Sequence, residues 1–162
     1  EKMHNASTIA GMAFANAFLG MNHSLAHKVG AVFHTPHGRA NAILLPHVIR
    51  YNGQVPDKLQ AWPKYNYYVA HEKYQTDARL LGLAASTPEE GVESLANAVM
   101  ELGKTVGIKM NFADQKITEE EWLSHLDEVA YMAYEDQCSP ANPRVPMVED
   151  MKKILLKSFK GN

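Results

Sequence analysis

The 162-residue chain contains one cysteine, Cys138, and this scarcity excludes an internal disulfide. A domain without disulfides depends on its hydrophobic core, and a chain of this length can bury a sizeable one. A single cysteine is also typical of proteins from reducing compartments. The sequence therefore favours a cytoplasmic protein stabilised by its core.

Long apolar runs and an excess of one charge are absent as well. No apolar run reaches the length of a transmembrane helix, and no signal-peptide pattern opens the chain. Lysine and arginine number 16 and aspartate and glutamate 18, a formal net charge of −2. This balance gives no electrostatic basis for binding nucleic acid or an anionic membrane, so neither partner is expected.

The alternating pattern typical of strands is also missing. Apolar residues instead recur at helical spacing between breaks marked by glycine and proline. The stretch 54–65 contains two prolines and is predicted to be a loop. The expected fold is an all-α bundle forming one domain over residues 1–162. Seven helices are predicted, over residues 1–19, 22–33, 36–51, 67–81, 88–106, 118–134 and 147–159.

Several residues are predicted to start or interrupt these helices. Asn22, Thr35 and Thr87 are candidate N-caps, because their side-chain oxygens can accept from the free N–H groups of a first turn. Gly20 marks the break between the first two helices. Gly11 and Gly20 both lie in apolar surroundings, where a glycine permits close packing or a bend.

The chain begins at Glu1, where the pattern is already helical. We expect it to be part of a larger protein. The alternative is a complete domain from which a tag has been trimmed.

Histidine is abundant, with eight residues, and three of them occur close together in the sequence. His23 and His27 are four residues apart and share one helix face. His37 lies in the first turn of the next helix, so an antiparallel pairing would bring it near His23. Imidazole is the commonest protein ligand for zinc and iron, although such spacing also arises by chance. The other histidines are expected at the surface or hydrogen-bonded in the core: His4, His34, His47, His71 and His125.

Carboxylates are absent from the region around these histidines, since no aspartate or glutamate occurs between residues 2 and 51. A catalytic metal site needs three or four protein ligands and one open position. We therefore expect further ligands to come from outside this chain.

Three segments resemble the signature of iron-containing (group III) alcohol dehydrogenases: AGMAFANA at 10–17, GMNHSLAH at 20–27 and PHGRANAILLPHV at 36–48. The run EDQCSPANPR at 135–144 resembles the end of the same fold. Together with FHTPHG at 33–38, it is most similar to the alcohol dehydrogenase domain of bifunctional aldehyde–alcohol dehydrogenases. The resemblance covers nearly the whole chain and is weaker between residues 55 and 116.

The resemblance implies an N-terminal nucleotide-binding domain, a C-terminal helical domain and a metal ion between them. Of four implied ligands, an aspartate and a histidine would lie upstream, and the last two match His23 and His37. His27 matches a residue near the nicotinamide with a proton-transfer or orienting role. Phe14 and Cys138 match positions that line the substrate pocket. No glycine-rich dinucleotide fingerprint occurs here, so no cofactor-binding residue is assigned.

The implied function is part of a dehydrogenase that interconverts primary alcohols and aldehydes with NAD(H) and Fe²⁺ or Zn²⁺. The expected partners are the small substrate, the N-terminal nucleotide-binding domain and further copies of the same protein. This chain alone is expected to be inactive. Two alternatives stay open: a non-catalytic helical assembly or interaction module, and a small histidine-based metal-binding bundle without a redox role.

Overall fold

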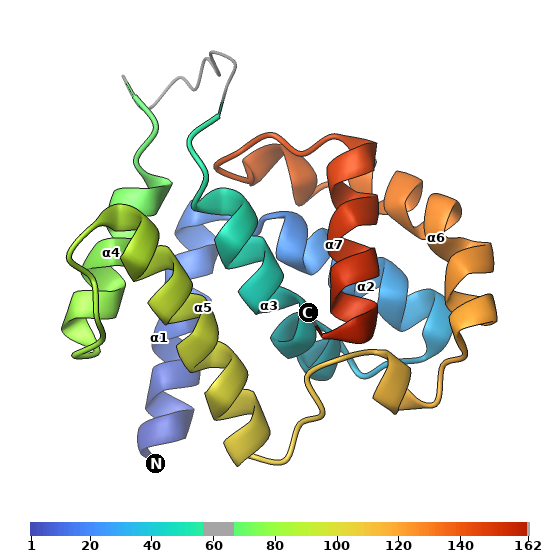
Figure 1. Cartoon of the computed structure of the whole chain (residues 1–162), viewed down its shortest axis with the longest axis horizontal. Coiled ribbons are helices and arrows are strands. Elements are labelled where there is room, and N and C mark those ends of the chain that lie inside the picture. The colour runs from blue at the N-terminus through green and yellow to red at the C-terminus, as the bar shows by residue number, and fades with distance from the viewer. Residues whose placement is uncertain (57–66, 162) are drawn as a thin grey trace.

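The computed structural model describes residues 1–56 and 67–161, and within them all regular secondary structure is helical. No strand occurs in this part of the chain, so the predicted all-α class is confirmed (Figure 1). Two short 3₁₀ turns, η1 (Ala113–Gln115) and η2 (Ser139–Ala141), lie between the later helices. The α-helices are α1 (Lys2–Ala17), α2 (Met21–Phe33), α3 (His37–Asn52), α4 (Ala70–Leu80), α5 (Pro88–Thr105), α6 (Glu119–Tyr134) and α7 (Val148–Lys160).

The predicted N-caps are right at one position and wrong at two. The Thr87 hydroxyl accepts from the backbone N–H of Glu90 at 3.2 Å, as predicted. Asn22 is not a cap, because α2 begins one residue earlier, at Met21. The side-chain amide of Asn22 instead donates to Oδ1 of Asn41 on α3 at 2.8 Å. Thr35 is not a cap either, because it is buried and the helix begins after Pro36.

The fourth predicted helix begins later than expected, at Ala70. Tyr68 precedes it, and its hydroxyl donates to the carbonyl oxygen of Asn52 at 2.6 Å. This bond ties the approach to α4 to the end of α3. Most of the predicted loop 54–65 falls on residues 57–66, which lie outside the described residues.

An aromatic stack forms the centre of the main core. Trp122 of α6 is fully buried. Its ring centroid lies 4.8 Å from that of Phe33, 4.9 Å from Phe112 and 5.3 Å from Phe159. Each such pair contributes roughly 0.5–1.5 kcal/mol beyond the burial of its area. The stack therefore joins the end of α2 to α6 and α7.

Helix α3 lies in the middle of the bundle, with α5 on one side and α2 and α7 on the other (Figure 1). Its Ile43 and Leu44 belong to the main core, which α2, α6 and α7 complete. Ile49 belongs instead to a second apolar cluster, with Val92 and Leu95 of α5. Because α3 belongs to both clusters, its position is fixed from two sides.

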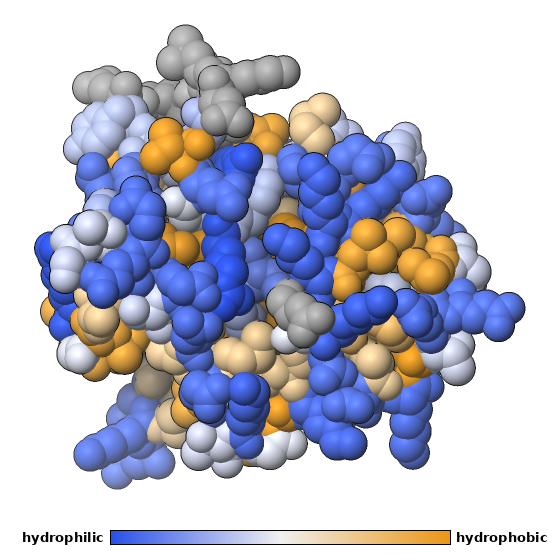
Figure 2. Space-filling view, viewed as in Figure 1, coloured by the Kyte–Doolittle hydropathy of each residue, from blue (hydrophilic) through white to orange (hydrophobic). Residues whose placement is uncertain are grey.

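The face of the bundle drawn in Figure 2 is mostly hydrophilic, and its apolar side chains form separate patches. Between α6 and α7, the exposed side chains of Leu123 and Leu156 line a shallow hollow. Among the described helices, none combines the length and apolar character needed to cross a bilayer.

Helix α1 differs from the other helices because none of its side chains is buried. Met3, Ile9 and Met12 are 80%, 66% and 66% exposed. A Cβ atom built on Gly11 would meet no atom within 4 Å, whereas one on Gly20 would lie 2.7 Å from Oδ1 of Asn142. The expected close packing is therefore found at Gly20 and not at Gly11.

One core histidine lacks the hydrogen bond expected for it. His47 of α3 is buried, and its Nε2 meets no hydrogen-bonding partner among the described residues. Burial, followed by the positive charges of Arg50 and Lys157, lowers the pKa of His47 to about 4. Its imidazole is therefore neutral in the folded protein at neutral pH.

This histidine should make the fold sensitive to acid. The pKa of His47 is lower in the folded chain than in the unfolded one, so the unfolded chain takes up a proton first as the pH falls. The contribution of His47 to the free energy of unfolding is therefore full above pH 6.5 and declines as the pH falls towards 4. We expect a loss of about 2 kcal/mol in the free energy of unfolding between pH 7 and pH 5 from this group. Urea unfolding should show that His47→Gln removes this part of the loss. An equal loss in both proteins would contradict the assignment.

Candidate metal centre

The three clustered histidines come from α2 and the start of α3. His23 and His27 are one helical turn apart on α2 and project from the same face. The chain reverses after Phe33, where His34 takes a left-handed conformation with φ 53°. Helix α3 then begins at His37 and packs against α2. This short turn brings His37 back beside the two histidines of α2.

The three imidazoles form one cluster. The ring centroid of His37 lies 5.2 Å from that of His23 and 5.2 Å from that of His27, and His23 and His27 are 6.0 Å apart. Each ring offers a nitrogen within 4.8 Å of a nitrogen of the other two. The predicted convergence of His23 and His37 is thus found, with His27 beside them.

The surroundings of His23 favour its neutral ring. Burial lowers the pKa of His23, and the neighbouring His37 and His27 lower it further, while Asp136 acts in the opposite direction. The Nδ1 atom of His23 is shielded from solvent and has no hydrogen-bonding partner among the described residues. A shielded, unpaired nitrogen on a neutral imidazole suits a divalent transition metal, because metal ligation requires a deprotonated ring nitrogen. The residues present therefore fit Fe²⁺ or Zn²⁺.

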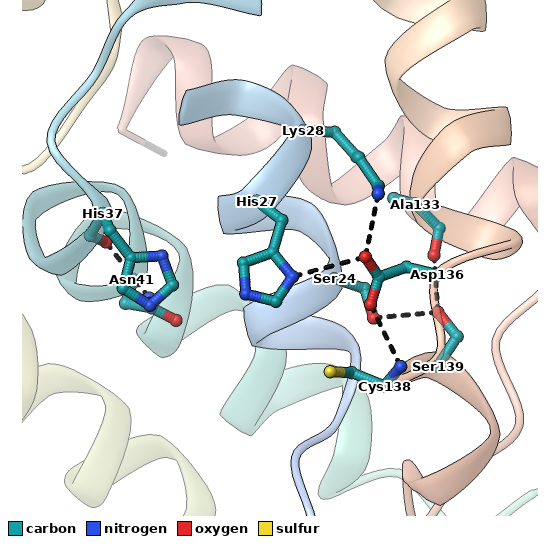
Figure 3. Close-up of polar contacts among 9 residues, drawn as sticks. All are labelled: Ser24, His27, Lys28, His37, Asn41, Ala133, Asp136, Cys138 and Ser139. Carbon is teal, nitrogen blue, oxygen red and sulfur yellow. Dashed lines mark hydrogen bonds and ion pairs between the residues drawn. The ribbon is translucent and has the colours of Figure 1, made fainter. Parts of the chain in front are cut away.

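Asp136 orients His27 from the segment that follows α6. Its Oδ2 lies 3.3 Å from Nδ1 of His27 and 2.9 Å from Nζ of Lys28 (Figure 3). Burial would raise the pKa of Asp136, but hydrogen bonds from Lys28, the backbone N–H of Cys138 and His27 hold it well below its usual range. The ionised carboxylate engages Nδ1 of His27 and leaves Nε2 for other contacts.

Cys138 contacts the same carboxylate through its backbone. Its backbone N–H donates to Oδ1 of Asp136 at 3.0 Å, and its side chain is buried. Burial, together with the hydrogen bond and negative charge of Asp136, raises the pKa of the Cys138 thiol to about 11. The thiol is therefore protonated at neutral pH and acts as a small apolar surface.

Phe14 and Asn41 border the cluster on its other sides. Phe14, near the end of α1, is half-exposed, and its ring centroid lies 6.2 Å from that of His23. The Asn41 side-chain nitrogen lies 3.0 Å from Nε2 of His37 and so holds that ring from its own helix (Figure 3). The two predicted pocket residues, Phe14 and Cys138, thus lie near His23 and His27 respectively, as parts of different elements.

Sequence reasoning missed Lys28, Asn41 and the contact of Asp136 with His27. The contact joins residues 109 positions apart, so no local spacing could reveal it. Asn41 follows His37 by four residues, and this helical spacing was an available signal.

The comparison with known proteins decides the family. The model for the C-terminal part of the Fe-containing alcohol dehydrogenase family matches residues 1–159. The chain belongs to this family. The resemblance seen in the sequence, and the helical domain that it implied, are confirmed.

Members of the Fe-containing alcohol dehydrogenase family align over almost the whole chain. The aldehyde-alcohol dehydrogenase of Streptococcus pneumoniae serotype 2 is 70% identical over 161 residues, which are 99% of this chain and 18% of that protein. The bifunctional aldehyde-alcohol dehydrogenase of Escherichia coli K12 is 42% identical, with the same shares. The structure of the alcohol dehydrogenase from Oenococcus oeni matches with a TM-score of 0.80 at 30% identity, over 98% of this chain and 37% of that one. The chain thus spans less than a fifth of the two curated relatives.

The protonated, buried thiol predicts a slow alkylation. At pH 8, iodoacetamide should modify Cys138 in the folded chain at least about 100-fold more slowly than in the chain unfolded in urea, because thiolate is scarce and access is blocked. Mass spectrometry of timed samples measures both rates. Similar rates under the two conditions would contradict the described burial.

Proposed function

We propose that this chain is the helical, metal-binding part of a longer dehydrogenase that interconverts primary alcohols and aldehydes with NAD(H). The observation that carries the proposal is the convergence of three imidazoles in a chain of the Fe-containing alcohol dehydrogenase family. The dehydrogenase names of its relatives supply the reaction class. Because the chain spans 18% of those relatives, the remaining ligands and the nucleotide-binding surface would lie in the rest of the longer protein.

The side chains of such a site would have three different roles: metal ligation, proton transfer and lining of the substrate pocket. His23 and His37 would hold the ion from two adjoining helices. When bound, the ion would act as a Lewis acid on the substrate oxygen, and the nicotinamide would exchange the hydride. His27 is partly exposed, and with Nδ1 directed to Asp136 its Nε2 would move a proton between the reacting hydroxyl and solvent. Phe14 and Cys138 would give the substrate pocket an apolar lining.

The exposed apolar face of α1 supports a partner surface next to the site. A helix with none of its side chains buried gains stability when another domain covers it. The nucleotide-binding domain of the longer protein, or a further copy of the protein, would cover this face of α1. The same face favours the second candidate function, a non-catalytic assembly module. A longer protein that binds metal and oxidises alcohols supports the dehydrogenase, and one that does neither supports the assembly module.

The ligand roles predict the effect of removing either imidazole. In the longer protein, His23→Ala and His37→Ala should each weaken metal binding by more than about 100-fold and abolish ethanol oxidation, since ligands matter more than their outer-shell partners. Elemental analysis and NADH absorbance measure these changes. His125→Ala, which removes an imidazole of α6, should retain both properties. A metal-replete, active His23→Ala protein would refute the assignment.

The role of His27 predicts a different pattern. His27→Gln should retain the bound metal while kcat falls by roughly 10²–10⁴-fold, because a proton-transfer group is lost and both ligands remain. Measuring metal content and kcat on the same preparation separates the two effects. Loss of metal together with activity would instead make His27 a ligand.

A further inference from the structure

The segment after α6 runs along α2 in the opposite direction. Contacts join the two at every third residue, and the first two of these contacts are drawn in Figure 3. The contacts are Asp136 Oδ2 to His27 Nδ1 at 3.3 Å, Ser139 Oγ to Ser24 Oγ at 3.0 Å and Asn142 Oδ1 to the backbone nitrogen of Met21 at 3.2 Å. The first two turns of the helix that carries two histidines of the cluster are thus held by one remote segment.

Asn142 makes the last of these contacts with a fully buried side chain. Its Oδ1 accepts from the backbone N–H of Met21 and from the amide of Asn52 at 3.4 Å. Its Nδ2 donates to Oδ1 of Asn52 at 2.8 Å and to the carbonyl oxygen of Arg144 at 2.6 Å. Both hydrogen-bonding atoms of the amide are therefore used, and the residue has one orientation.

Helix α2 has no cap of its own. Its N-cap residue is Gly20, which has no side chain to accept from the first-turn N–H groups. Asn142 accepts from one of them instead. A Cβ atom on Gly20 would lie only 2.7 Å from Oδ1 of Asn142, so the glycine leaves the space that this remote amide occupies.

The first turn that Asn142 caps contains His23. The backbone N–H of His23 donates to the carbonyl oxygen of Gly20 at 3.1 Å, two residues after the N–H from which Asn142 accepts. Fraying of this turn would move His23 relative to His37, which stands on a different helix. The 5.2 Å separation of their rings therefore depends on where α2 begins.

We propose that Asn142 is a positioning residue of the metal centre, which caps α2 from a remote part of the chain and fixes His23 opposite His37. The inference rests on the proposed function, because it assumes that these two rings bind a metal ion. It adds a role for Asn142 that the ligand set itself does not contain.

The test is a mutant cycle in the longer protein, which supplies the remaining ligands, with the Zn²⁺ affinity of the metal-free form measured by competition with a chromogenic chelator. Asn142→Ala should bind Zn²⁺ about tenfold or more weakly, as for losses of outer-shell partners. It should also lower Tm by roughly 5–10 °C, because buried partners are left unpaired. Gly20→Ser alone should also weaken binding, because its Cβ meets Oδ1 of Asn142.

The double variant Gly20→Ser/Asn142→Ala provides the rescue. Alanine at position 142 vacates the space, and Gly20 already has the extended conformation in which a serine hydroxyl caps a helix. The double variant should fold and bind Zn²⁺ more tightly than either single variant. This rescue tests the proposal even where Asn142→Ala does not fold.

Val92→Ala is the matched control, since it opens a cavity in the second apolar cluster, which contains no residue of α2. It should lower Tm while Zn²⁺ affinity stays unchanged. Wild-type affinity in folded Asn142→Ala, or a double variant no better than the single ones, would overturn the inference and leave the metal site intact. Unchanged Zn²⁺ affinity in the His23→Ala and His37→Ala variants of the longer protein would overturn the proposed function itself.

Discussion

The proposed metal centre depends on the contacts between α2 and the segment that follows α6, which together are called the clamp. Asp136, Ser139 and Asn142 contact α2 in reverse order at intervals of three residues. A helix presents one face at such intervals, so a segment running along it can hold that face at successive turns. The clamp sets where α2 begins and how His27 is turned. The turn after α2 then delivers His37 to the same place.

Charge is distributed around the cluster in a way that suits this arrangement. The region from residue 2 to residue 51 contains no carboxylate, so the imidazoles stand on helices without acidic neighbours in sequence. The carboxylate that reaches them, Asp136, is shared between His27 and Lys28. Lys28 balances the negative charge, and the pKa of His23 stays below its ordinary value, which favours the neutral ring that metal ligation requires.

Much of the fold could be predicted from the sequence, because helical periodicity and glycine or proline breaks are local signals. The seven α-helices found in the described part of the chain, and the pairing of His23 with His37, follow from such signals. The failures at Asn22 and Thr35 have a tertiary cause. Asn22 is engaged by Asn41 on the next helix, and a glycine with a remote amide takes over the capping. The clamp could not be predicted from local signals either, because each of its contacts joins residues more than 100 positions apart in the sequence.

The most direct measurement is an anomalous difference map, collected at the iron edge from crystals of the longer protein loaded with Fe²⁺. The proposed centre predicts one peak within coordination distance, about 2.0–2.2 Å, of a ring nitrogen of both His23 and His37. A peak at another site, with these two rings unliganded and their helices well ordered, would contradict it.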